Sequence, residues 1–358
     1  MRLQPSARTL AAAVAAPLAL ALVAACGSGR TSSAGTSGAT SPSSAAPAAG
    51  ATGTPSAGAG GSGSPSGTPS GTASTGPGTS AASSPASSSA AGTVELPRGG
   101  REVFPRYRLV GFSGAPGSAA FGRLGVGDLD DRVAEIEKVA RNYRAGREVL
   151  PVLELIAVVV QRYPGRDGLY RTPIGDDVIR RYLDAARRHR ALLLLNIQPG
   201  RASFVDEVRA LERWLREPDV GLALDPEWAV RPGQTPGRVF GSTTGAVIDQ
   251  VSSYVDGIVR TNGLPQKVLV VHQLNPGIVR GFEKVRERDG VVVIKSVDGI
   301  GSAGAKITTW KRLVKNLPSA LHPGFKLFFD EDTEGGLKLM TPSQVLALRP
   351  QPEYELYE

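Results

Sequence analysis

Residues 192–228 read LLLLNIQPGRASFVDEVRALERWLREPDVGLALDPEW. The stretch begins with an unbroken apolar run at 192–195 that continues to Ile197, and it holds a second apolar run at 220–224. Short aliphatic runs of this kind are typical of strands buried on both faces of a parallel sheet. Between the two runs, Ser203 is a favourable N-cap for a helix over residues 204–215. The stretch therefore predicts one strand–helix–strand unit.

The same alternation continues on both sides of that unit. Further apolar runs stand at 109–112, 149–153, 268–271, 291–294 and 325–329, with a weaker one at 354–357. Helix start signals precede residues 128–140, 176–189, 246–259, 277–286 and 341–348, and a glycine-rich turn at 299–304 leads into one more helix. Eight strands and seven helices in about 260 residues predict an α/β fold, a single-domain (β/α)8 TIM-type barrel. An open doubly wound sheet is the alternative, but it usually needs fewer strands, and nothing marks a reversal of strand order.

The N-terminal residues have the features of an export signal. Arg2 and Arg8 precede an apolar stretch at 10–22, which is shorter than the roughly 20 residues of a membrane span and suits a signal-peptide core. The stretch ends in Val-Ala-Ala-Cys-Gly at 23–27, which resembles the bacterial lipobox. The resemblance implies that Cys26 receives a diacylglycerol, with acyl chains such as palmitate, and becomes the N-terminus after cleavage. The alternative is an ordinary signal peptide with a chance cysteine. Cys26 is the only cysteine, and a thiol without a partner is unusual in an exported protein unless it is consumed.

Three parts of the chain follow from this pattern. Residues 1–25 are the expected lipoprotein signal peptide. Residues 26–98 are the lipidated cysteine and a Gly/Ser/Ala/Thr/Pro linker, whose composition predicts disorder because it offers little apolar surface to bury. Residues 99–358 are the expected barrel domain. The predicted location is the extracytoplasmic face of the cell membrane, with the lipid as anchor.

The charge of the domain favours no nucleic-acid partner. Residues 99–358 hold 37 of the 41 Lys and Arg residues and 32 of the 33 Asp and Glu residues, a formal net charge of about +5. The two signs alternate within the predicted helices, with no basic run and no aromatic platform. We expect a monomer whose partners are the membrane, through Cys26, and a polysaccharide or cell-wall glycan.

Polar side chains follow nearly every predicted strand, at the end of a barrel where active sites lie. They are Glu154; Asn196, Gln198 and Arg201; Asp225, Glu227 and Trp228; His272 and Gln273; Lys295 and Asp298; and Asp330, Glu331 and Asp332. Polar residues must appear wherever strands reach water, which explains one or two of them. That explanation accounts less well for acids clustered after four different strands.

Paired carboxylates can act as general acid and as base or nucleophile on a glycosidic bond. The catalytic candidates are Asp225, Glu227, Asp330, Glu331 and Asp332. The other strand-end residues are candidates for substrate binding, with Trp228 able to stack on a sugar ring. We expect a glycoside hydrolase that acts on cell-wall or extracellular polysaccharide. The alternative is a non-catalytic barrel that binds glycan or peptide, or organises the wall. Acids after the fourth and seventh strands resemble retaining barrel glycosidases in architecture only, because Asp-Pro-Glu replaces their Asn-Glu pair.

No cofactor is predicted. The run at 299–304 matches G-x-G-x-x-G, but no acid stands about 20 residues further on, so a helix-capping turn is favoured over a dinucleotide site. Lys295 occupies the position of a Schiff-base lysine in barrel aldolases, which is unexpected chemistry for the cell wall. With His272 the only histidine at a strand end, a histidine-rich zinc site is disfavoured. A carboxylate-bound Ca²⁺ or Mg²⁺ stays open as an alternative.

From about residue 107 to the C-terminus, the chain resembles a family of exported actinobacterial proteins with a glycosidase-like barrel. The resemblance rests on the segments 154–157, 196–201, 222–228, 271–273, 297–299 and 324–332. It implies the barrel and the exported location, and it implies no particular reaction.

Overall fold

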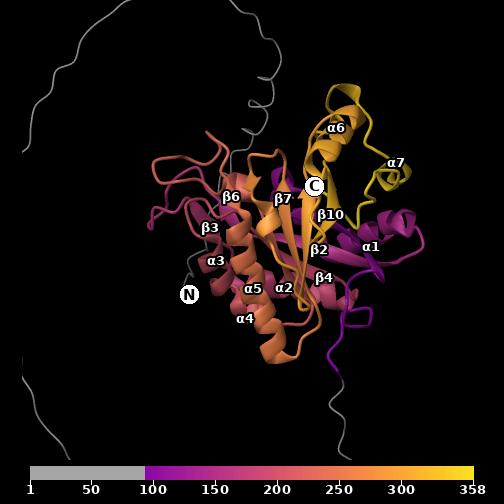
Figure 1. Ribbon diagram of the computed structural model, residues 1–358, viewed down its shortest axis with the longest axis horizontal. Helices are drawn as coiled ribbons and strands as arrows, with labels where there is room; N and C mark the ends of the chain where they lie inside the picture. The colour runs from indigo at the N-terminus through magenta and orange to yellow at the C-terminus, as the bar shows by residue number, and fades with distance from the viewer. Residues whose placement is uncertain (1–92) are drawn as a thin grey trace, which may run out of the picture. The chain divides into compact units, whose positions relative to one another are not determined.

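A computed structural model of the protein describes residues 93–358 (Figure 1). The predicted signal peptide, Cys26 and most of the predicted linker lie outside the described residues. Among residues 93–358, no helix combines the length and apolar character needed to cross a membrane.

The core of the fold is a closed barrel of eight parallel strands, which confirms the predicted (β/α)8 class. The strands are β1 (Tyr107–Gly114), β2 (Glu148–Val160), β4 (Leu192–Ile197), β5 (Val220–Leu224), β7 (Lys267–Gln273), β9 (Val291–Val297), β10 (Leu321–Leu327) and β11 (Tyr354–Tyr357). Each pairs in parallel with the next, and β1 closes the ring by pairing with both β2 and β11. The short β3 (Arg171–Pro173) runs antiparallel to the end of β2, and β6 (Thr243–Thr244) pairs with β8 (Val279–Arg280) outside the barrel.

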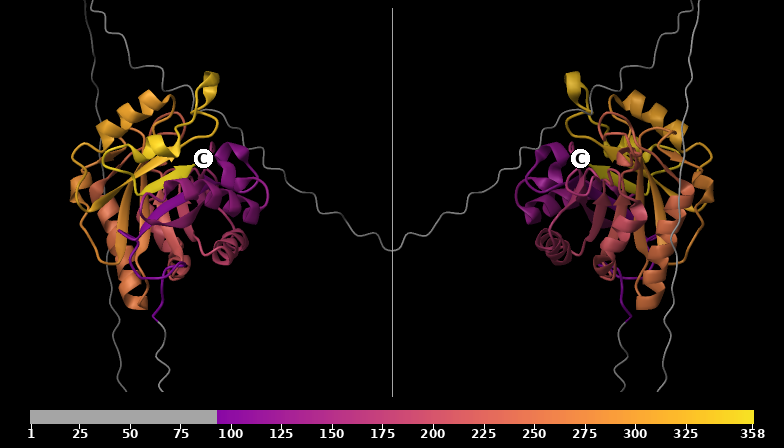
Figure 2. Two further views of the ribbon diagram at one scale, coloured as in Figure 1. Left: turned by 90° about the vertical axis from the view of Figure 1, so that its right-hand side faces the viewer. Right: turned by 90° about the vertical axis from the view of Figure 1, so that its left-hand side faces the viewer.

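Helices cover the outside of the barrel (Figure 2). They are α1 (Leu129–Ala140), α2 (Asp176–Arg188), α3 (Phe204–Ala210), α4 (Glu212–Leu215), α5 (Gly245–Asn262), α6 (Ala303–Leu313) and α7 (Pro342–Leu346). Short 3-10 turns occur at η1 (Ala119–Phe121), η2 (Arg123–Gly125), η3 (Arg141–Tyr143), η4 (Pro226–Trp228), η5 (Phe282–Lys284) and η6 (Glu334–Gly336). Several helices begin where the sequence places a cap, since Asp128, Thr244, Ser302 and Thr341 each accept a backbone hydrogen bond in the first turn.

Two of the predicted helices differ in the structure. The predicted helix at 277–286 is wrong, because this segment forms β8 and η5 and crosses from β7 to β9 without an α-helix. Gly281 interrupts it in the left-handed region, at a φ of 72°. The predicted helix at 204–215 is divided into α3 and α4, because Leu211 leaves the helical conformation. In addition, the strand expected at 325–329 runs instead from 321 to 327.

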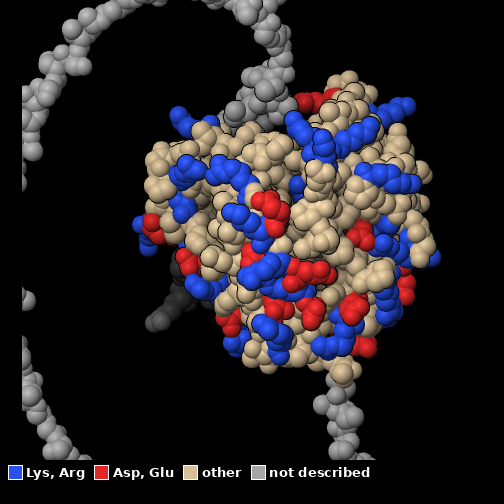
Figure 3. Space-filling model, viewed as in Figure 1, with Lys and Arg blue, Asp and Glu red and all other residues tan. Residues whose placement is uncertain are grey.

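Two apolar layers hold the barrel together. One fills the interior and includes Leu109, Val152, Leu194, Val270 and Ile294, and the other packs the outer faces of the strands against the helices. The interior leaves little room beside β2, since a Cβ built on Gly111 would lie 2.3 Å from the backbone oxygen of Val152. The charged surface is of mixed sign on the face shown in Figure 3, with Lys and Arg interspersed among Asp and Glu.

The segment at 94–106 closes the end of the barrel where the strands begin. Leu96 and Val103 are buried in the interior apolar layer, and the Tyr107 hydroxyl donates to the backbone oxygen of Gly99 over 2.7 Å. The described chain enters the domain at this end (Figure 1). Residues just before position 99 therefore belong to the packed structure.

Candidate functional site

The inner face of the barrel changes from apolar to polar at the end where the strands finish. Side chains alternate along a strand, so a residue two positions beyond a buried inner residue also points inward. By this alternation Glu154 follows Val152, Asn196 follows Leu194, and His272 follows Val270. The same holds for the other strands. We call the inner polar group, with the side chains bonded to it, the polar layer: Glu154, Asn196, Asp225, His272, Ser296, Asp298, Lys326, Tyr354 and Glu358.

Glu154 is the centre of the polar layer and is fully buried, with 0% exposure. Its Oε1 accepts from Asn196 Nδ2 and His272 Nε2, each at 3.0 Å, and its Oε2 accepts from the Tyr354 hydroxyl at 2.5 Å. Burial by itself would raise the pKa of Glu154. The charge and hydrogen bond of His272 outweigh burial and hold the pKa below its ordinary value. Glu154 is therefore ionised and joins β2 to side chains from three other strands.

His272 lies between two carboxylates. Its Nδ1 donates to Asp298 Oδ2 over 2.7 Å, while its Nε2 donates to Glu154 Oε1. Burial opposes the charged form, but Asp298 and Glu154 raise the pKa of His272 well above its ordinary value. His272 is therefore a doubly protonated imidazolium at neutral pH, because each ring nitrogen needs its hydrogen to meet a carboxylate.

Asp225 comes directly after β5 and is held by two amides. Its Oδ1 accepts from Asn196 Nδ2 at 3.0 Å and its Oδ2 accepts from Gln198 Nε2 at 3.2 Å. Its Oδ1 also lies 4.0 Å from His272 Nε2. Burial raises the pKa of Asp225 above its ordinary value, against the opposing charges of His272 and Lys326.

Glu227 follows two residues later, on η4, and differs in its surroundings. Its Oε2 is buried and has no hydrogen-bond partner. Burial raises the pKa of Glu227 well above its ordinary value, and the charges of Asp225 and Asp298 add to the shift. The shift favours the protonated form of Glu227, whereas the pKa values of Glu154 and Asp298 in the polar layer are lowered.

Lys326 supplies the second positive charge of the polar layer. Its Nζ lies 2.6 Å from Glu358 Oε2 and 3.7 Å from Asp298 Oδ2. Although burial opposes its charge, Glu358 and Asp298 raise the pKa of Lys326 well above its ordinary value. Asp298 also accepts from the Ser296 hydroxyl over 2.8 Å, and its pKa stays low because His272 and Lys326 outweigh burial.

Buried polar atoms without a partner gather at this end of the barrel. They include the hydroxyl oxygen of Ser113, Oδ1 of Asn196 and Oε2 of Glu227. More than nine in ten buried polar groups in proteins have a hydrogen-bond partner, so each unpaired one calls for an explanation. A hydrogen bond from a bound ligand or a water would account for an unpaired oxygen of this kind.

Two of the other predicted site residues lie in loops that follow the barrel strands. Trp228 is half-buried on η4, next to Glu227. The Arg201 guanidinium donates to the backbone oxygen of Gln234 and lies 4.3 Å from the ring centre of Tyr170. Arg201 thus joins the loops that follow β2 and β5.

Several predicted site residues lie away from the polar layer. Lys295 points outward, where its Nζ donates to the Leu313 backbone oxygen over 2.6 Å. The Gln273 amide binds the backbone oxygen of Asn275 at 3.0 Å. Asp330 is exposed and Glu331 is half-buried, with a pKa raised by burial.

Asp332 is buried but belongs to a separate ion pair. Its Oδ2 lies 2.8 Å from Lys306 Nζ, and its two oxygens also accept from the backbone nitrogens of Gly301 and Phe328. These contacts tie the loop after β10 to the loop after β9. Asp332 is therefore fully engaged in holding loops together.

The sequence reasoning missed Ser296, Lys326, Tyr354 and Glu358. Its search began where each apolar run stops, whereas Lys326 and Tyr354 lie inside strands. The alternation of inner and outer positions was the signal that could have found them, since Gly324 and Leu356 are inner residues two positions away from Lys326 and Glu358.

Within residues 93–358, no group of three or more His, Cys, Asp and Glu side chains is arranged to hold a metal ion. A scan of the whole chain against protein-family models finds no match, and a search of curated proteins finds no relative. The chemistry of the polar layer therefore carries the functional conclusion.

Proposed function

We propose that the protein is a lipid-anchored cell-envelope glycoside hydrolase that cleaves cell-wall or extracellular polysaccharide. Glu227 is the proton donor, and Asp225 is the carboxylate that assists departure of the sugar. The observation that carries the proposal is the contrast between these two neighbours. Glu227 has a strongly raised pKa and a buried oxygen without a partner, while Asp225 is held by two amide donors.

The reaction divides between the two carboxyl groups. Glu227 transfers its proton to the glycosidic oxygen as the bond from that oxygen to the anomeric carbon breaks. The electron-deficient anomeric carbon is stabilised by the Asp225 carboxylate. Water then adds its hydroxyl group to that carbon and gives its remaining proton to the Glu227 carboxylate, which restores the acid. Asn196 and Gln198 fix the orientation of Asp225, and Trp228 offers an aromatic face to a sugar ring.

The test is glycan release by the full-length protein from purified wall polysaccharide and from peptidoglycan. New reducing ends are measured for the native protein and for Glu227→Gln and Asp225→Asn. The matched control is Asp330→Asn, which changes an exposed acid outside the polar layer. We expect the native protein and the control to release product, and Glu227→Gln and Asp225→Asn each to lose roughly 100-fold or more in rate.

The alternative is a non-catalytic barrel that binds glycan. It is favoured by the internal pairing of Glu154 and Asp298, whose oxygens are engaged by Tyr354, His272 and Ser296. If the protein retains a glycan on a pull-down but the native form releases no product, the hydrolase proposal is wrong and the binding function stands.

A further inference from the structure

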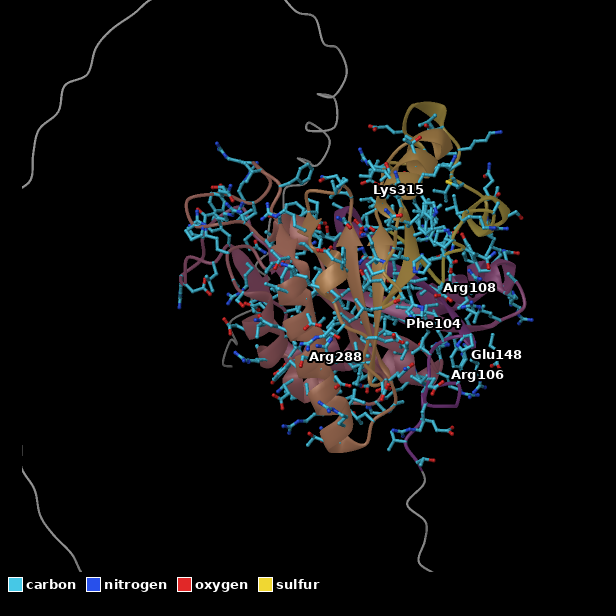
Figure 4. All side chains as sticks on the ribbon, viewed as in Figure 1. Phe104, Arg106, Arg108, Glu148, Arg288 and Lys315 are labelled. Carbon is cyan, nitrogen blue, oxygen red and sulfur yellow. The ribbon has the colours of Figure 1, made fainter. Side chains whose placement is uncertain are left out.

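Two adjoining cavities lie at the end of the barrel opposite to the polar layer. The larger has a volume of about 560 Å³ and is lined mainly by the end of α1, by η3 and by the start of β2. The smaller, of about 450 Å³, lies against the end of α2. Arg98, Glu137 and Glu148 line both. We call the two together the basic cavity. Figure 4 shows Glu148 beside Arg106 at this end, and the two side chains are 3.1 Å apart.

Arginine dominates the lining. The basic cavity has six arginines against two glutamates: Arg98, Arg141, Arg144, Arg147, Arg188 and Arg190, with Glu137 and Glu148. Three of the arginines have an acidic partner, because Arg98 pairs with Glu137, Arg147 with Glu353 and Arg188 with Asp130.

The other three arginines have no acidic partner among the described residues. Arg141 and Arg144 are exposed. Arg190 donates to the backbone oxygen of Pro97 over 2.8 Å, which leaves its charge uncompensated. The guanidinium groups of these three arginines can therefore bind an anionic ligand.

The backbone beside these arginines is strained. Ala145, next to Arg144, has a φ of 42°, and Arg190 itself has a φ of 52°. These are two of the four non-glycine residues with positive φ in the part of the chain that the structure describes. A side chain makes this conformation unfavourable, and glycine would adopt it at lower cost. Arg190 follows the end of α2, where the Ala191 backbone nitrogen donates to the Ala186 backbone oxygen over 2.8 Å, so this conformation ends the helix beside the basic cavity.

We infer that the basic cavity binds the phosphate group of a phosphorylated sugar or polyol. The planar guanidinium group matches two phosphate oxygens with two parallel hydrogen bonds. The volume of each of the two cavities falls within the range of about 300–1,000 Å³ that is usual for small-molecule sites. The phosphate belongs either to a carbohydrate, free or in a polymer, or to a lipid headgroup. The site does not depend on the polar layer, which lies at the other end of the strands.

The test is calorimetric titration of the full-length protein with glucose 6-phosphate and with glucose. The variant Arg141→Gln/Arg144→Gln removes two unpaired charges from the basic cavity. The matched control, Lys311→Gln/Arg312→Gln, removes two exposed charges from α6. We expect glucose 6-phosphate to bind, glucose not to bind, the cavity variant to bind about tenfold more weakly or worse, and the control to bind as the native protein does.

A second arm uses vesicles of phosphatidylglycerol in place of glucose 6-phosphate. Binding to vesicles alone, lost in the cavity variant, supports the phosphate site and assigns its ligand to a lipid headgroup. The inference is overturned if neither probe binds, or if the cavity variant binds both as tightly as the control does. Both variants should keep the native melting temperature and the native rate of glycan release, since their side chains are exposed and remote from the polar layer.

Discussion

At the scale of the residue, burial and neighbouring charges favour the protonated form of Glu227 beside the carboxylates of the polar layer. Its positive charges, His272 and Lys326, are outnumbered by the carboxylates of Glu154, Asp225, Asp298 and Glu358. A further negative charge on Glu227 would meet repulsion from Asp225 and Asp298 in a buried site. Burial raises the pKa of Glu227 most, and this excess of negative charge raises it further.

The pH dependence of glycan release should follow from these shifts. Asp225 must be ionised, and its pKa lies above the ordinary value of 3.8, so the rate should rise with pH above that value. Glu227 must be protonated, and its pKa lies well above the ordinary value of 4.5, so the rate should fall again at higher pH. The measurement is the profile of kcat/KM against pH. An alkaline limb that persists in Glu227→Gln would contradict the assigned role.

Removing the imidazolium should destabilise the barrel. In His272→Gln, Glu154 and Asp298 lose the charge between them, and breaking a buried ion pair costs about 3–5 kcal/mol of unfolding free energy. The folded pKa of His272 is raised above the ordinary value of 6.5. Its contribution is therefore complete below pH 6.5 and is lost as the pH rises through the raised folded value.

Urea unfolding at several pH values measures this effect. His189→Gln is the control, because His189 is only partly buried and pairs with Asp130 near the surface. We expect the unfolding free energy of His272→Gln to be much lower than that of the native protein at pH 6, and the difference to become smaller in alkaline buffer. For His189→Gln we expect only a small decrease in unfolding free energy. Equal deficits in the two variants would show that the charge of His272 does not stabilise the fold.

At the scale of the element, the segment that connects β7 to β9 contains no α-helix, and hydrogen bonds to Asp249 hold it in place. Asp249 on α5 accepts from the Arg286 backbone nitrogen at 2.9 Å and from the Arg288 guanidinium at 2.7 Å. Hydrogen bonds from Arg288 hold the pKa of Asp249 far below its ordinary value. Because its pKa is lowered in the folded protein, the Asp249 carboxylate stabilises the fold at pH values above the ordinary pKa of 3.8. This stabilisation is lost as the pH falls towards the folded pKa.

Asp249→Asn should therefore lower the unfolding free energy by about 1–2 kcal/mol at pH 7, where charge-assisted hydrogen bonds are lost. Denaturant unfolding at pH 7 and pH 2.5 measures the difference in unfolding free energy between the native protein and Asp249→Asn. Asp184→Asn on α2 is the control, since Asp184 is exposed and lies outside this crossing. The expectation fails if Asp249→Asn unfolds like the native protein at pH 7.

The elements show which parts of the fold the sequence could predict. Strands were recognisable because a barrel strand is buried on both faces, which leaves an unbroken apolar run such as 192–195. The segment at 277–286 has apolar residues and a proline at its start, as a helix would. Its conformation depends on Gly281 and on the tertiary contact with Asp249, which a local pattern does not contain.

The candidate site was predictable to the extent that side chains follow the strand ends. Glu154, Asn196 and Asp225 were found in this way, and the structure brings them within hydrogen-bonding distance. Asp330 was included because the apolar run extends to Phe329, two residues past the true end of β10. The actual contribution of β10, Lys326, is flanked by apolar residues and looks like an interruption of the strand.

At the scale of the whole molecule, the proposed lipid at Cys26 decides where the domain is found. Cys26→Ser should abolish incorporation of labelled palmitate and move the protein from the detergent phase to the aqueous phase, because Cys26 is the only cysteine. Ser28→Ala is the control, since it changes a neighbouring residue without touching the thiol. Palmitate labelling that persists in Cys26→Ser would overturn the proposed anchor.

The position of the entering chain has a mechanical consequence. The chain joins the barrel at the end closed by Leu96 and Val103, and Glu154 and His272 lie at the other end. Tension on the N-terminal segment is therefore borne first by contacts such as the one between Tyr107 and Gly99. A pulling force at this end of the domain acts first on these contacts. The carboxyl groups of the polar layer, at the other end of the strands, therefore keep their spacing.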